Sequence, residues 1–73
     1  MTPELFNKAG AALFGERWHH PLAEALGVNP RSIQRFASGS RDIPDRFRSE
    51  LIRLLENKGG EIGLIIKELE GKK

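Results

Sequence analysis

Apolar residues recur at helical spacing along this chain, and glycine and proline divide them into segments. The first segment carries an apolar stripe made of Leu5, Phe6, Ala9, Ala12 and Leu13. Thr2 can cap this helix, and Pro3 fits its first position, where the missing N–H of proline costs nothing. The pattern predicts a helix that begins at Pro3 and ends at Gly15.

Two short helices are predicted next. The second helix begins between Arg17 and Pro21, because proline is tolerated only in a first turn, and it ends at Gly27. Asn29 followed by Pro30 is the clearest helix start in the sequence, and the third helix runs from there to about residue 37. The inward residues of the two helices are Leu22, Ala23, Leu26, Ile33 and Phe36.

The C-terminal third of the chain predicts two more helices. One follows Ile43-Pro44, and the pair Gly59-Gly60 is expected to close it. Its apolar stripe consists of Phe47, Leu51, Leu54 and Leu55. The last helix, about 61–70, carries Ile62, Ile65, Ile66 and Leu69. Because no strand alternation competes, residues 1–73 are expected to form one all-α domain of five helices.

Arginine is concentrated in the middle of the chain. From Arg17 to Arg48 there are six arginines against three carboxylates, a net charge of +3, and every lysine lies outside this segment. The planar guanidinium matches phosphate and the edge of guanine better than an ammonium group does. Any one arginine can simply solvate a helix face, but their concentration favours a polyanionic partner.

Composition also limits location and chemistry. The chain has no cysteine, which fits a reducing cytosol. Its N-terminus lacks the pattern of a signal peptide, and no apolar run is long enough to cross a bilayer. We therefore expect a cytoplasmic protein without a membrane segment.

Few residues suggest catalysis or metal binding. His19 and His20 point to different sides of a helix, and only His20 and Glu24 share a face, which is too few ligands for a metal site. The sequence offers no nucleophile–base set, phosphate-binding glycine loop or carboxylate pair. No metal, no cofactor and no enzymatic activity are expected. Trp18 is expected to pack against the first helix and not to stack on a base.

The most informative stretch is 19–38, which reads HHPLAEALGVNPRSIQRFAS. Ala23 is small where the next helix must approach closely, Gly27 can supply a left-handed turn, and Val28 can fill the space beneath it. Together with the inward apolar residues, these positions predict a helix-turn-helix.

This stretch resembles the helix-turn-helix of the lambda-repressor-like proteins, including the Cro/CI and XRE-type regulators. The resemblance is carried by L-A-x-x-L-G-V, which begins at Leu22, and by N-P-R-S-I-Q-R-F, which begins at Asn29. It implies a compact five-helix DNA-binding domain, in which the third helix enters the major groove of double-stranded DNA.

The outward residues of that helix suit base reading. Arginine can bind guanine O6 and N7 together, and glutamine can bind adenine N6 and N7. The expected base-reading residues are Arg31, Ser32, Gln34 and Arg35. The expected backbone contacts are Arg17, His20, Asn29, Ser38, Ser40 and Arg41. For Ser32 and Gln34 the alternative is an ordinary solvated helix face.

The last helix is apolar over more of its circumference than one interface needs, because Leu64 lies off its main stripe. A homodimer is therefore expected through Ile62, Leu64, Ile65 and Leu69, which would read a pseudo-palindromic operator. The expected function is a transcriptional regulator, most simply a repressor. Two alternatives stay open: an antitoxin-like or phage-module component whose last helix binds another protein, and an interaction module that has lost DNA binding.

Overall fold

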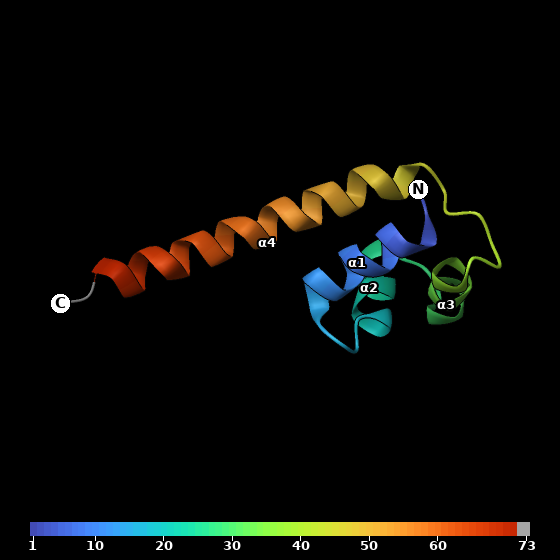
Figure 1. The fold of residues 1–73 in the computed structure, drawn as a ribbon, viewed down its shortest axis with the longest axis horizontal. Coiled ribbons are helices and arrows are strands. Elements are labelled where there is room, and N and C mark those ends of the chain that lie inside the picture. The colour runs from blue at the N-terminus through green and yellow to red at the C-terminus, as the bar shows by residue number, and fades with distance from the viewer. Residues whose placement is uncertain (72–73) are drawn as a thin grey trace.

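The computed structural model describes residues 1–71, which form four helices and no strand. Helix α1 spans Pro3–Phe14, α2 His19–Leu26, α3 Pro30–Ser38 and α4 Arg46–Gly71. Helices α1, α2 and α3 gather beneath the first part of α4, which then continues alone toward the C-terminus (Figure 1). The expectation of an all-α protein is confirmed for the described residues.

The ends of the first three helices are set by the capping residues that the sequence indicates. The Thr2 hydroxyl accepts a hydrogen bond from the Leu5 N–H at 3.2 Å, and the Asn29 side-chain oxygen accepts one from the Arg31 N–H at 2.8 Å. Gly27 ends α2 with a φ of 71°, a left-handed conformation that is costly for a residue with a Cβ. These interactions satisfy backbone groups that a helix end leaves without partners.

A row of aromatic side chains in mutual contact runs through the core. Phe6 on α1 packs edge-on against Trp18 and Phe36, with ring centroids 5.7 and 6.0 Å apart, and Phe36 meets Phe47 of α4 in the same way at 5.6 Å. Edge-to-face contacts of this kind add to the free energy gained by burying the rings. Trp18 is only 7% exposed, so the expectation that it packs in the core is confirmed.

The predicted apolar face of α1 is partly wrong. Phe6 and Leu13 are buried, but Leu5 is 51% exposed and Ala12 is exposed. Gly10 takes the buried place instead, and a Cβ there would overlap the Trp18 indole. The Trp18 indole thus packs against α1 at Gly10, where any residue with a side chain would overlap it.

The predicted break at Gly59-Gly60 is also wrong. Helix α4 runs without interruption for 26 residues, so the described part of the chain has no separate fifth helix. Neither glycine adopts a positive φ, the conformation by which glycine ends a helix. A glycine inside a helix costs only about 1 kcal/mol relative to alanine, which the helix-forming residues on both sides can offset.

The two parts of α4 have different surroundings. Phe47 and Leu51 are buried, and Leu54 and Leu55 pack against the core. The Lys58 ammonium group donates a hydrogen bond to the Leu13 carbonyl oxygen at 2.8 Å, at the C-terminal end of α1. Every described residue beyond Lys58 is exposed, so this half of α4 projects from a molecule 51 Å long and 21 Å across.

No helix within residues 1–71 combines the length and the apolar character that crossing a membrane requires.

Candidate nucleic-acid interface

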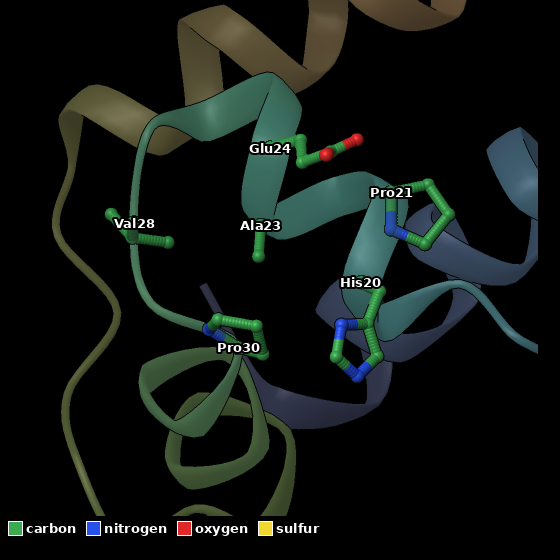
Figure 2. A pocket seen from close by; sticks show the side chains of 6 residues that line it. All are labelled: His20, Pro21, Ala23, Glu24, Val28 and Pro30. Atoms are coloured by element: carbon green, nitrogen blue, oxygen red, sulfur yellow. The ribbon is translucent and has the colours of Figure 1, made fainter.

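Helices α2 and α3 pack directly against each other around a small residue. Ala23 is 1% exposed, and its side chain points toward the start of α3, where Pro30 lies (Figure 2). The Val28 N–H donates to the Ala23 carbonyl oxygen at 2.9 Å across the turn at Gly27. A larger side chain at position 23 would separate the helices, so this close contact fixes how α3 is presented.

Helix α3 has one buried and one exposed face. Ile33 and Phe36 are 0% and 4% exposed and anchor the helix in the core. On the other side Arg31, Gln34 and Arg35 are all exposed, and spacings of three and four residues place them on one face. The helix therefore presents two guanidinium groups and one amide together to solvent.

Ser32, the fourth expected base-reading residue, lies differently. It is half-buried, between the exposed face and the anchored face of α3. Ser32 therefore lies at the margin of the surface that Arg31 and Arg35 form, and its side chain is too short to extend as far from the helix as theirs.

A group of polar residues follows α3. The Ser38 and Ser40 hydroxyls are 2.8 Å apart, and the Ser38 hydroxyl donates to the Arg35 carbonyl oxygen at 3.2 Å. The guanidinium carbon of Arg41 lies 6.0 Å from the centre of the Phe36 ring. All three expected backbone contacts in this segment are exposed, and local hydrogen bonds hold the two serines in place.

The start of α2 contributes a second group. A surface depression brings Gln34 of α3 together with Arg17 and His20, which precede it by more than ten residues in the chain. Glu16 and His19 line the same depression, and the His19 imidazole stacks on the Trp18 indole with ring centroids 4.0 Å apart. Glu16 and His19 are not among the contacts expected from the sequence, because only the packing of α2 on α3 brings them beside Gln34.

His20 also lines a second depression, between α2 and the start of α3. Figure 2 shows its imidazole directed toward Pro30, with Pro21 and Glu24 at the rim. Asn29, the other expected contact near this point, is exposed, and its side-chain oxygen caps α3. The expected contacts thus border α3 at both of its ends.

Within residues 1–71, the arginines of this surface have no carboxylate partner. Among residues 1–71 the one ion pair joins Arg46 and Glu50 on α4, with 3.9 Å between nitrogen and oxygen. Arg31 and Arg35 are therefore open to an external anion. No group of three histidine, aspartate or glutamate side chains within the described chain is placed to hold a metal ion.

The four expected dimer residues lie outside this surface, on the projecting half of α4. Ile62, Leu64, Ile65 and Leu69 are 47%, 67%, 55% and 70% exposed. Helix α3 lies at the other end of the long molecule, so the projecting half of α4 does not cover it (Figure 1).

No protein family model, no curated protein and no solved structure matches this chain.

Proposed function

We propose that this protein is a sequence-specific double-stranded DNA-binding protein, a transcriptional regulator and most simply a repressor, that inserts α3 into the major groove. The observation that carries the proposal is the joint exposure of Arg31, Gln34 and Arg35 on a helix whose opposite face is anchored by Ile33 and Phe36. An α-helix fits the major groove, where each base pair presents a distinct set of donors and acceptors.

The side chains on that face match the edges of particular bases. Arg31 and Arg35 each carry a fork of donors for O6 and N7 of guanine, and the Gln34 amide can both donate to and accept from adenine. Arg31 is the second residue of α3 and Gln34 is its middle residue, and the N-terminal part of a recognition helix is the part that reaches the bases. Ser32, at the margin, is the weakest of the four expected base contacts.

Residues on both sides of α3 supply the contacts to phosphate. Arg17 and His20 lie beside the base-reading surface at the start of α2, and Asn29 offers its amide N–H groups at the start of α3. Ser38, Ser40 and Arg41 lie at the other end of α3 and can contact the sugar-phosphate backbone. Contacts on both sides would fix the register of the helix in the groove.

The first test is selection of bound duplexes from a random pool, followed by titration of variants on the selected site. Arg35→Ala and Gln34→Ala are expected to cost about 1–3 kcal/mol on that site and much less on random DNA, since each removes a base contact. Arg41→Ala is expected to weaken binding to both DNAs alike, because it contacts phosphate.

Lys8→Ala is the control, since Lys8 is an exposed cation on α1 that is not among the expected DNA contacts. Equal losses on specific and random DNA for Arg35→Ala would show that α3 does not read bases. If the wild-type protein shows no salt-sensitive binding to any duplex, the proposal fails entirely.

One observation favours a second candidate. The projecting half of α4 exposes five large apolar residues, which are Ile62, Leu64, Ile65, Ile66 and Leu69. Exposed apolar patches of this kind mark protein interaction sites. An antitoxin-like or phage-module component would bind DNA and use this helix to bind a different protein. An interaction module that has lost DNA binding would bind only protein. The DNA titration separates these two alternatives, because only the first binds a duplex.

A further inference from the structure

An uninterrupted apolar seam runs along most of α4. Ile52, Gly59 and Ile66 alternate with Leu55, Ile62 and Leu69 at spacings of three and four residues. This alternation is the pattern by which two helices pack along each other. Only the continuity of α4 through Gly59 joins these six positions into one face.

The first part of this seam borders an apolar groove. Met1 and Leu5 of the N-terminal segment and Ile52 and Leu55 of α4 line the groove, and three of these residues are 40–51% exposed. The second part of the seam, beyond Lys58, has no neighbour within the described chain, and Ile66 and Leu69 are 49% and 70% exposed. One molecule thus presents both an apolar groove and an apolar helix face, on the same side of one helix.

We infer that the occupant of this seam is a second copy of the chain, with the two α4 helices antiparallel and crossing near Gly59 and Gly60. Leu55 of each copy then lies level with Ile66 of the other, and Ile52 lies level with Leu69. Each projecting helix end fills the groove of the other molecule, and the same patch serves both copies, as a twofold interface requires. Gly59, which has open space around it, lets the two helices approach closely at the crossing.

Charge favours the antiparallel arrangement. Glu56 and Glu70 border the seam on one side, and Arg53 and Lys67 lie one position further round on that side. In the antiparallel register Glu56 faces Lys67 of the second copy, and Glu70 faces its Arg53. Both pairs therefore bring opposite charges together. In a parallel pair Glu56 would face Leu51 and Glu70 would face Ile65, and neither carboxylate would face a cation.

This pairing assigns different roles to neighbouring apolar residues. Ile62, Ile66 and Leu69 lie on the seam, whereas Leu64 points to another side of the helix and Ile65 lies at the margin. The pairing itself does not depend on DNA binding. Its use in reading two half-sites does rest on the proposed function.

Sedimentation equilibrium without DNA tests the pairing. The wild-type protein is expected to dimerise at micromolar concentration. Ile66→Glu is expected to weaken the dimer about a hundredfold or more, because one buried side chain is lost from each copy. Leu64→Glu is the matched control, an equally drastic change on the same exposed half-helix, and is expected to leave the dimer intact. Both positions lie outside the core, so circular dichroism should show folded protein in each case.

Cysteine cross-linking tests the orientation, since the chain has no cysteine of its own. A mixture of Leu55→Cys and Ile66→Cys proteins is expected to form a disulfide-linked dimer upon oxidation, whereas each protein alone forms little. The charge reversal Glu56→Lys should weaken the dimer, and addition of Lys67→Glu should restore it.

Three results would overturn the inference. One is a wild-type protein that stays monomeric at high micromolar concentration, and another is equal weakening by Leu64→Glu and Ile66→Glu. The third is cross-linking of either single-cysteine protein with itself as efficiently as in the mixture, which would indicate parallel helices. None of these results bears on whether the isolated α3 surface binds DNA.

Discussion

Single residues in this protein show how far local chemistry can be predicted from sequence. Thr2 and Asn29 cap their helices as their types and their positions before proline indicate. Gly10 was not predicted to be special, because a glycine inside a helix gives no sign of what lies against it. Its role depends on Trp18, eight residues away, and only the folded chain brings the two together.

The contact at Gly10 leads to a prediction on stability. Gly10→Ala is expected to lower the free energy of unfolding by about 1–3 kcal/mol, because the new methyl group would displace the Trp18 indole from its buried place. Urea unfolding followed by the fluorescence of Trp18, the one tryptophan in the chain, measures this directly.

Gly60→Ala is the matched control for that measurement. It makes the same substitution in a helix, but a Cβ at Gly60 meets open space. Without a clash, the higher helix propensity of alanine is expected to leave stability unchanged or to raise it by up to about 1 kcal/mol. If both substitutions changed stability in the same direction, the packing of Trp18 on Gly10 would not matter for folding.

At the scale of helices, the sequence predicts the bounds of α1 and α3 to within about one residue, brackets the start of α2 between Arg17 and Pro21, and fails at α4. The first three helices end at glycines with positive φ, whereas Gly59 and Gly60 are helical. A glycine therefore ends a helix at some positions and lies inside a helix at others, and its residue type alone does not show which conformation it adopts. The inward positions of α2 and α3 were predictable from spacing alone, because a helix-turn-helix constrains both helices at once. Leu5 could not be placed, because its exposure depends on where α4 lies.

The contrast between the two halves of α4 predicts the result of a truncation. A chain that ends at Gly59 keeps Phe47, Leu51 and the Lys58 hydrogen bond to Leu13, and so keeps all the buried hydrophobic residues found within residues 1–71. At concentrations where the full-length protein is monomeric, its free energy of unfolding is expected to differ from that of the full chain by less than about 1 kcal/mol. A truncated chain that unfolds in dilute solution would show that the projecting half supports the core.

At the scale of the whole molecule, the two proposed surfaces lie far apart. The exposed face of α3 is at one end, and the projecting half of α4 extends toward the other (Figure 1). The exposure of Arg31, Gln34 and Arg35 could be predicted from sequence, because the pattern of α3 determines which side faces the core. The groove beside Leu5 and Ile52 could not, since it is formed by residues more than forty positions apart in the chain, which only the packing of α1 on α4 brings together.

The Lys58 hydrogen bond to Leu13 separates the part of α4 that packs on the core from the part whose described residues are all exposed, so the two parts are expected to differ in local stability. Helical segments of fewer than about 12–15 residues are marginal in water without packing. Amide hydrogens before Lys58 should therefore exchange with solvent only through global unfolding, and those after it through local fraying. Hydrogen-exchange mass spectrometry is expected to show a sharp fall in protection after residue 58 in dilute protein. Protection of residues 60–70 that rises with protein concentration would follow from the pairing, and equal protection on both sides at every dilution would contradict this division.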